Sequence, residues 1–419
     1  MRTKGKAALW TTVLMSCAAI QAAAQAAEYT FPPEWAPHDA MWMAWAEPPE
    51  HREVQIQMMQ AIVPHTPLRL LVRDADDRRT ATEALRAADI DEARVTFVEH
   101  ALYSVWTRDY GPRFLTNGES LAIADLAWNA YGYPAELRVG FERDPMAVGK
   151  LDNDLAARFE IATITSDVVG EGGGIEVSSD VLMTYRETAM QRNPGVPLEV
   201  IENEYQRLYG KKIAWLSRSP LSDRVFSGPK YENYFGWGAN GHIDEYVRFV
   251  DDRTIVIAQI DEKDAAEDAL STVDREILLE NLAELEALTD ANGEPYEIVT
   301  LPTPALQHYM WTGPLPEDAK ARDVMGAWYR SFEVGDEIHW IPALSYLNFV
   351  ITNGIVLAPA YWQEGIPERE REKDEEVRRT LARLFPDREI VQINPLALNW
   401  SGGGMHCITQ QQPSVVAGQ

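Results

Sequence analysis

The sequence predicts an α/β fold. Short runs of apolar and β-branched residues, typical of buried strands, alternate along the chain with stretches of helical periodicity. The 419 residues contain no flexible linker or low-complexity segment that would divide them into domains. Such alternation indicates an α/β architecture. No exact internal repeat is visible, so the pattern does not tell how many structural units the chain contains.

The expected elements follow one another along most of the chain. The expected strands span Leu68–Val72, Val95–Val98, Leu121–Asp125, Val181–Tyr185, Ile213–Leu216, Thr254–Ile260, Tyr296–Leu301, Ile355–Pro359 and Ile390–Ile393. The expected helices span Glu50–Ile62, Thr80–Ala88, Leu198–Tyr209, Ala265–Leu288 and Glu368–Leu384.

The first 27 residues are predicted to be a secretory signal peptide. Basic residues at positions 2, 4 and 6 precede an apolar run from Ala7 to Ile20, and the alanine-rich segment Ala22–Ala27 follows. A less favoured interpretation is lipoprotein processing at Cys17, because Met15 fits that signal poorly. No later stretch of about 18 apolar residues exists, so no membrane span is expected. We therefore expect an exported protein, periplasmic or extracellular, with residues 28–419 as its functional domain.

The mature chain is strongly acidic. Removing the three positive charges of residues 1–27 changes the formal net charge from −27 to −30. Nucleic-acid recognition requires basic patches, so a nucleic-acid partner is not expected. Dispersed acidity mainly keeps an exported protein soluble, and it is also compatible with a cationic substrate.

The chain has two cysteines, Cys17 and Cys407, and the signal segment contains the first. A single remaining thiol cannot form an internal disulfide, so Cys407 is either inert and buried or chemically used. Judged by residue type alone, the inert interpretation is favoured, because free cysteine is among the most buried residues.

The segment Gly241–Arg248 alternates in polarity. As a strand it would place His242, Asp244, Tyr246 and Arg248 on one polar face. The alternative is an ordinary half-exposed strand with a solvated face.

The segment Trp106–Pro112 places an aromatic ring near a carboxylate. Gly111-Pro112 indicates a turn, which would leave Asp109 at the end of an extended run. A carboxylate beside an aromatic surface suits a planar cation. The alternative is a turn-capping aspartate with a tryptophan of the core.

Two glycine-rich segments, Glu171–Gly174 and Gly402–Gly404, could let a ligand approach the backbone closely, and the second leads directly to Cys407. The alternative for each is a tight turn. The first lacks the Lys-Ser/Thr ending of a phosphate loop. No spacing typical of a zinc or calcium site occurs, and neither does a Gly-x-Ser-x-Gly elbow, so no metal is expected and Cys407 is the best candidate nucleophile.

Taken in order, these segments resemble the agmatine deiminase and bacterial peptidylarginine deiminase family of guanidino-group-modifying enzymes. The resemblance covers nearly all of the mature chain and rests on Pro33–His38, Trp106–Pro112, Glu171–Gly173, Gly241–Asp244, Ser345–Phe349 and Gly402–Pro413. It implies the pentein fold, a five-bladed, pseudo-fivefold α/β propeller in one compact domain. That fold would explain the missing linker.

The resemblance also implies roles for single residues. Cys407 corresponds to the family's nucleophile, His242 to its acid–base residue, and Asp109 and Asp244 to its guanidinium-binding carboxylates. Trp106 and Asn348 match positions that line the substrate site, and Glu171 matches a glutamate of undefined role. The implied reaction is hydrolysis of a guanidinium through a covalent thiouronium, without metal or organic cofactor. A thiol pKa lowered by His242 and the bound cation would assist it.

The substrate is not fixed by these residues. Agmatine or a related small guanidine is the first expectation, and peptidyl-arginine or C-terminal arginine is the alternative. An arginine carboxylate would need a basic partner, for which Arg113, Arg138 and Arg186 are the candidates. Two further alternatives are an amidinotransferase and a non-catalytic periplasmic guanidine-binding protein. The sequence does not indicate an oligomeric state.

Overall fold

The computed structural model describes residues 29–46, 48–101, 104–132, 146–224, 230–290, 292–315, 317 and 332–415. The predicted signal segment, residues 1–27, lies outside this range, as does Arg138. In the part of the chain that is described, no helix is long and apolar enough to span a bilayer.

Five of the sheets share one ββαβ arrangement. In one of them β4 (Arg113–Thr116) runs antiparallel to β5 (Leu121–Ala127), and α6 (Leu151–Phe159) then connects β5 to the parallel strand β6 (Ala162–Val169). A helix is the usual connection here because parallel neighbours need a long crossover. We call the strand that runs antiparallel to the middle strand, such as β4, the leading strand.

The next three units repeat this order. Their leading, middle and third strands are β7 (Ile175–Val177), β8 (Val181–Tyr185) and β9 (Lys212–Leu216); β11 (Val247–Phe249), β12 (Thr254–Gln259) and β13 (Glu297–Pro302); and β16 (Val350–Thr352), β17 (Ile355–Pro359) and β18 (Glu389–Ile393). Their helices are α7 (Arg186–Arg192) with α8 (Leu198–Tyr209), α9 (Glu262–Ala265) with α10 (Ala269–Glu286), and α12 (Glu368–Leu384).

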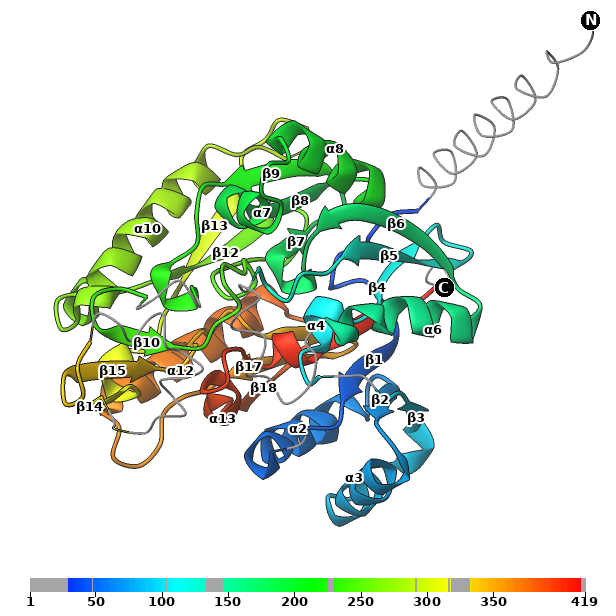
Figure 1. The fold of residues 1–419 in the computed structure, drawn as a ribbon, viewed down its shortest axis with the longest axis horizontal. Helices are drawn as coiled ribbons and strands as arrows, with labels where there is room; N and C mark the ends of the chain where they lie inside the picture. The colour runs from blue at the N-terminus through cyan, green and yellow to red at the C-terminus, as the bar shows by residue number, and fades with distance from the viewer. Residues whose placement is uncertain are drawn as a thin grey trace, which may run out of the picture.

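The fifth unit joins the two ends of the described chain. Its leading strand is β19 (Gln410–Pro413), which pairs antiparallel with β1 (His38–Ala44). Helix α2 (Pro49–Ile62) then connects β1 to the parallel strand β2 (Leu68–Val72). Helix α3 (Ala75–Ala87) connects β2 to a further parallel strand, β3 (Val95–Glu99). Figure 1 shows the units following one another around the molecule, with α3, α6, α8 and α10 at its outside. The predicted α/β fold with fivefold pseudo-repetition is confirmed.

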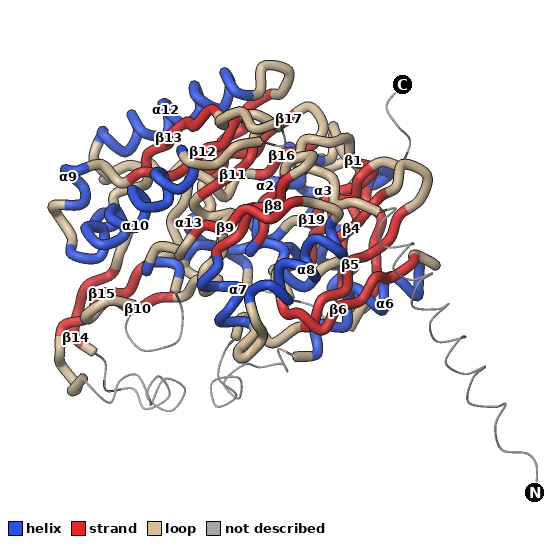
Figure 2. Tube along the Cα trace, turned by 90° about the horizontal axis from the view of Figure 1, so that it is seen from above, coloured by secondary structure: helices blue, strands red, loops and turns tan. Residues whose placement is uncertain are grey.

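A sixth sheet departs from the repeat. It has the order β10 (Tyr234–Gly236), β15 (Glu337–Ile341), β14 (Trp311–Pro314), and its strands lie between those of the regular units in the sequence. It projects at one end of the molecule in Figure 2. The side chains of Phe235, Leu315 and Ile338 form a small core of its own.

The local sequence explains most element boundaries. The middle strands β8 and β17 are buried along their whole length, as expected for strands covered on both faces. Helix α8 ends at Gly210, which adopts φ 66° and closes the last turn without a Cβ penalty. The helix expected at Ala265–Leu288 is instead divided into α9 and α10, because Asp268 caps α10 by accepting the N–H of Ser271 at 2.8 Å.

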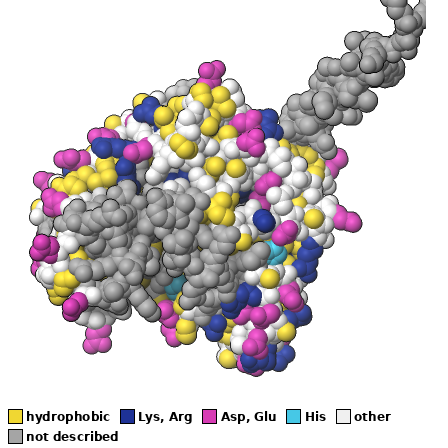
Figure 3. All heavy atoms as spheres, viewed as in Figure 1, with side chains coloured by type: hydrophobic (Ala, Val, Ile, Leu, Met, Phe, Trp, Pro, Cys, Tyr) yellow, Lys and Arg dark blue, Asp and Glu magenta, His cyan; other side chains and the backbone are white. Residues whose placement is uncertain are grey.

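Charged side chains of both signs are dispersed over the face shown in Figure 3, with acidic groups scattered among Lys and Arg. This distribution agrees with the interpretation of the acidic composition as a solubilising surface.

Candidate active site

Five of the segments singled out in the sequence precede leading strands. They are the short helix α4 (Thr107–Tyr110) before β4, the turn Gly172–Gly174 before β7, the turn at residues 241–246 before β11, residues 345–349 before β16 and the turn His406–Ile408 before β19. Each of the five units therefore contributes one segment. In Figure 1, α4 lies near the middle of the ring of sheets.

Gly173 lies where three of the predicted residues meet. A Cβ atom at this position would lie 2.6 Å from His242 Nδ1, 3.1 Å from an Asp109 oxygen and 3.1 Å from Asp244 Oδ2. The carbonyl oxygen of Gly173 also accepts the backbone N–H groups of Ile243 and Asp244. Because only glycine leaves this space open, Gly173 forms a floor around which one imidazole and two carboxylates converge.

The segment carrying His242 and Asp244 is a turn and not the strand expected from its alternation. The Asp223 carboxylate accepts the N–H groups of Gly241 and His242 at 2.8 and 2.7 Å, and Gly173 accepts the next two. These donors are therefore unavailable to a strand ladder. The segment is buried, so the polar face is directed into the protein and not toward solvent.

His242 lies between two carboxylates. Its Nδ1 is 3.6 Å from Asp109 Oδ1, and its Nε2 is 3.7 Å from Glu171 Oε2, while Glu171 also pairs with Arg192 Nε at 2.7 Å. Burial lowers the pKa of His242, but Asp109 and Glu171 outweigh it and raise that pKa to about 9. The imidazole is therefore charged at neutral pH and holds a proton to donate.

Asp109 lies in helix α4 and not at the end of the extended run that was expected. Its Oδ1 accepts the N–H of Gly173 at 3.1 Å, and its Oδ2 accepts the hydroxyl of Tyr131 at 2.8 Å. Burial raises the pKa of Asp109 despite the opposing effect of His242. The pKa of Glu171 is instead lowered to about 2, because Arg192 and His242 outweigh its burial.

Asp244 is fixed through one oxygen and leaves the other available. Its Oδ2 lies 2.6 Å from His406 Nδ1 and 3.4 Å from Asn348 Nδ2. Its Oδ1 is buried and, among the described residues, has no hydrogen-bond partner, and the same holds for both ring nitrogens of His242. Buried polar atoms without partners are rare, which indicates groups arranged for a ligand.

Cys407 lies beside Asn348 and Glu245. Its Sγ accepts from Asn348 Nδ2 at 3.3 Å and lies 3.5 Å from Glu245 Oε1. Burial and the carboxylates of Asp244 and Glu245 raise the pKa of Cys407 well above its usual range. The expected lowering of this pKa depends on a bound guanidinium as well as on His242, so it stays a prediction.

Trp106 and Asn348 both border Cys407, and their predicted place in the lining of the substrate site stays a prediction. A Cβ on Gly403 would lie 2.7 Å from the Trp106 ring and 3.1 Å from Cys407 Sγ, so ring and sulfur flank the same point. Arg248 donates to the carbonyl oxygens of Leu347 and Phe349 at 2.9 and 2.7 Å, which holds Asn348 between them.

Arg113 does not reach the substrate site as a clamp. It is buried, donates to the carbonyl oxygen of Gly170 at 2.8 Å and lies 3.7 Å from the Asp152 carboxylate. Its remaining donors are directed at the carbonyls of Asp109 and Ala124. Arg113 therefore supports the segments that carry Asp109 and Glu171, and the predicted contact with a substrate is wrong.

Sequence reasoning missed four residues of the site, namely Glu34, Tyr131, Glu245 and His406. Three of them lie in segments that had been singled out: Glu34 in Pro33–His38, Glu245 in Gly241–Arg248, and His406 next to Cys407. Adjacency to the nucleophile was the one available signal for His406. Tyr131 gave none, because it follows β5 in an irregular segment with φ 58°.

The oxygen and sulfur atoms of Asp244, Glu245 and Cys407 lie within 4.8 Å of one another. A cation would fit such a donor set. A guanidinium is such a cation. The expectation that the protein requires no metal stays a prediction.

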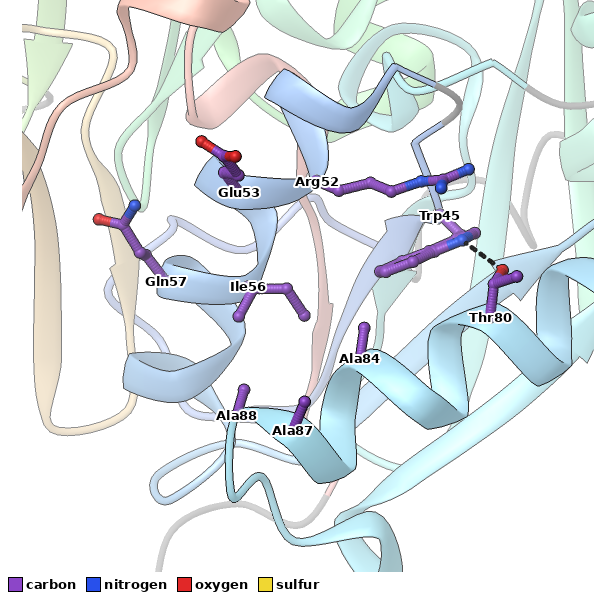
Figure 4. Close-up of a pocket in the computed structure, with 9 residues that line it drawn as sticks. All are labelled: Trp45, Arg52, Glu53, Ile56, Gln57, Thr80, Ala84, Ala87 and Ala88. Atoms are coloured by element: carbon purple, nitrogen blue, oxygen red, sulfur yellow. Dashed lines mark hydrogen bonds between the residues drawn. The ribbon is translucent and has the colours of Figure 1, made fainter.

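A separate pocket of about 600 Å³ lies between α2 and α3 on the outer side of one unit. Figure 4 shows its lining, in which Arg52 lies beside Trp45 and the Trp45 ring nitrogen donates to Thr80; the other residues are Glu53, Ile56, Gln57, Ala84, Ala87 and Ala88. None of the predicted site residues lines it, and it offers no nucleophile. The candidate active site is therefore the cluster around Gly173.

The chain is similar to known proteins over nearly all of the described residues. The family model described as Porphyromonas-type peptidyl-arginine deiminase matches residues 30–413. An agmatine deiminase of Pseudomonas putida is 28% identical over 403 residues, which are 93% of this chain and 96% of that protein.

Two solved structures share the fold. An agmatine deiminase of Enterococcus faecalis superimposes with a TM-score of 0.69 at 22% identity, covering 93% of this chain and 97% of the other. An agmatine deiminase of C. jejuni superimposes with a TM-score of 0.63 at 17% identity, covering 92% of this chain and 96% of the other.

Proposed function

Because the chain belongs to the Porphyromonas-type peptidyl-arginine deiminase family, whose members hydrolyse a C–N bond of a guanidino group, we propose that it deiminates agmatine or a related small guanidine. The nucleophile in this proposal is Cys407, and the products are a ureido compound and ammonia. The observation that carries it is the convergence of Asp109, Asp244 and His242 around Gly173. Asp244 Oδ1 and both ring nitrogens of His242 have no partner among the described residues, and they lie with the one described thiol in the same site.

The two carboxylates account for recognition of the cation. A guanidinium presents its N–H donors in a rigid plane, so acceptors on two sides fix its orientation. Asp244 offers its free Oδ1, and Asp109 offers a carboxylate whose raised pKa falls when a cation enters. The grip keeps the guanidinium protonated, which makes its central carbon electrophilic.

The covalent step begins with the thiol. Entry of the cation offsets the carboxylates that raise the pKa of Cys407, so the thiol gives up its proton to water. The thiolate then forms a bond to the guanidinium carbon. The charged His242 donates its proton to the departing amino group, the C–N bond breaks and ammonia leaves.

Hydrolysis of the resulting thiouronium reverses the role of His242. The neutral imidazole takes a proton from water, the hydroxyl adds to the same carbon, and the C–S bond breaks. As the C–S bond breaks, the hydroxyl proton passes to the sulfur, so Cys407 is released as a thiol together with the ureido product. Each turnover thus consumes one water and returns His242 to its charged state.

Two observations favour a small guanidine without a carboxylate. The described arginines around the site are already engaged: Arg192 pairs with Glu171, Arg248 with Glu34 and Glu176, and Arg108 with Gln411. A substrate carboxylate would therefore compete with existing pairs. The relative from Pseudomonas putida is named an agmatine deiminase.

Peptidyl-arginine is the second candidate, because the matching family model carries that description. The experiment that separates the two is ammonia release from agmatine, free arginine, and peptides with internal or C-terminal arginine, each with and without added glycine. We expect the highest kcat/KM for agmatine and no effect of glycine. A higher value for a peptide would move the assignment to the second candidate, a glycine-dependent product would indicate amidino transfer, and agmatine binding without ammonia from any compound would overturn hydrolysis.

We also propose that the protein is exported, on the basis of residues 1–27. The charged start, apolar run and alanine-rich end of this segment support removal by signal peptidase. N-terminal sequencing of the protein purified from its own cells tests this, and an intact Met1 would contradict it.

A further inference from the structure

A second imidazole lies behind the candidate site. His406 is buried, with its Nδ1 2.6 Å from Asp244 Oδ2 and its Nε2 2.8 Å from Glu34 Oε2. One ring, from near the C-terminal end of the described chain, thus joins a buried carboxylate near its N-terminal end to one from its middle. The mechanism above uses Asp244 but gives no role to His406 or Glu34.

Glu34 is itself held in place. Its Oε1 accepts the N–H of Ile351 at 2.9 Å, and its Oε2 accepts from Arg248 as well as from His406. The Glu34 carboxylate thus contacts hydrogen-bond donors. Burial raises the pKa of Glu34, but His406 and Arg248 outweigh burial and hold that pKa well below its usual range. An ionised Glu34 fixes the orientation of the His406 ring, as a second carboxylate does for many functional histidines.

We propose that His406, anchored by Glu34, is a positioning residue that orients the Asp244 carboxylate toward the guanidinium. Both nitrogens of the ring are engaged, so Asp244 Oδ2 is held from behind while Oδ1 stays open to the substrate. The backbone N–H of His406 adds a bond to Asn348 Oδ1 at 2.8 Å, so the same residue also places the amide beside Cys407.

The charged surroundings of this pair are well defined. The groups that face Asp244 come from five segments: Arg108 and Asp109 from α4, Glu176 from β7, His242 and Glu245 from its own turn, Arg248 from β11, and His406 and Cys407 from the segment before β19. Facing the His406 ring are Asp244, Glu34, Arg248 and Glu176, and Arg108 donates to its backbone carbonyl. Burial raises the pKa of Asp244, but His406 leads the groups that outweigh it and lower that pKa.

This inference rests on the proposed deiminase function, and its consequence can be read in a pH profile. Without His406, Asp244 would keep its proton to higher pH and lose its grip on the cation. The acid limb of kcat/KM should then move to higher pH, and KM should rise more than kcat falls. A purely structural role would lower activity without moving the limb.

Four variants test the assignment. H406L removes the ring contacts to Asp244 and Glu34. H406N keeps one N–H donor near the position of Nδ1, where it can still reach Asp244. E34Q replaces the Glu34 carboxylate by an amide, whose N–H group would face the donors that the carboxylate accepts. E370Q is the matched control, because Glu370 resembles Glu34 in its burial and contacts. Its carboxylate forms an ion pair with Lys373 at 2.8 Å and accepts the backbone N–H of Ala305 at 3.0 Å. It lies in α12, away from the site.

We expect H406L and E34Q to lose about 10- to 100-fold in kcat/KM for agmatine, as for a lost hydrogen bond to a charged group. Both should shift the acid limb upward, H406N should recover part of the loss, and E370Q should leave the limb unchanged. The inference would be overturned if the acid limb of kcat/KM does not move in E34Q and H406N, or if these variants lose no more kcat/KM than E370Q does. These two variants decide the question even if H406L fails to fold.

Calorimetric binding of agmatine to C407A, alone and combined with E34Q, separates this inference from the proposed function. Agmatine binding without wild-type ammonia release would overturn hydrolysis alone, and the effect of E34Q on that binding would still decide the role of His406. If agmatine neither binds nor reacts, both are overturned.

Discussion

Replacing Gly173 by alanine should inactivate the enzyme while leaving its fold intact. The added Cβ would lie 2.6 Å from His242 Nδ1 and 3.1 Å from oxygens of Asp109 and Asp244, so at least the imidazole must move. Relieving the first contact to an ordinary distance near 3.5 Å requires a displacement approaching 1 Å, and a misplacement of about 1 Å can cost roughly 100-fold in rate. The methyl group would also occupy the space assigned to the guanidinium, so we expect a loss of at least about 100-fold in kcat/KM.

Gly174 provides the matched control. The nearest atoms to a Cβ on Gly174 are 3.9 Å and 4.0 Å away, which is ordinary contact distance, although the residue belongs to the same turn. Ammonia release from agmatine, measured for G173A and G174A together with their thermal unfolding midpoints, gives the comparison. If G173A keeps kcat/KM within threefold of G174A, Gly173 is not the floor of the site.

Three further outcomes are expected. Glu171 is one of the carboxylates that raise the pKa of His242 to about 9, so in E171Q the imidazole should lose its charge at a lower pH. The alkaline limb of the kcat–pH profile should then move to lower pH, and an unmoved limb would exclude this coupling. R192M leaves Glu171 buried without its ion pair and should lower the free energy of urea unfolding by about 3–5 kcal/mol. R218M removes an exposed ion pair and should lower it by at most about 1 kcal/mol. Equal losses would contradict a structural role for the buried Arg192–Glu171 pair. In the enzyme without substrate, iodoacetamide should alkylate Cys407 more slowly than free cysteine at pH 8, because the pKa of this buried thiol is raised; faster alkylation would show an activated thiolate.

The elements with a clear apolar pattern could be predicted from the sequence. The strands Leu68–Val72, Val181–Tyr185 and Ile355–Pro359 and the helices Leu198–Tyr209 and Glu368–Leu384 have the expected bounds. Their periodicity is strong because a whole face, or both faces, is buried.

The leading strands could not be predicted in this way. Strands β11 and β16 have only three residues, and β19 is polar along most of its length, with three glutamines before Pro413. They are stabilised by pairing with a longer neighbour, which no local pattern reveals. The closure of the ring by β19 and β1 joins residues more than 360 positions apart, as in the pair Trp42 and Gln410.

The residues of the site were predicted better than its geometry. Polarity and resemblance indicated His242 and Asp244, but alternation suggested a strand, since the Asp223 carboxylate that captures the backbone N–H groups lies about twenty residues earlier. Arg113 was misassigned because a buried arginine that donates to carbonyl groups looks in sequence like one available to a substrate. Partners distant in the chain decide both cases.

Ammonia release by the C407A variant tests the central claim most directly. With agmatine as substrate, the wild-type enzyme should release ammonia, and C407A should release none above the uncatalysed background while unfolding at the wild-type temperature. Ammonia release by folded C407A at a rate near that of the wild type would contradict Cys407 as the nucleophile.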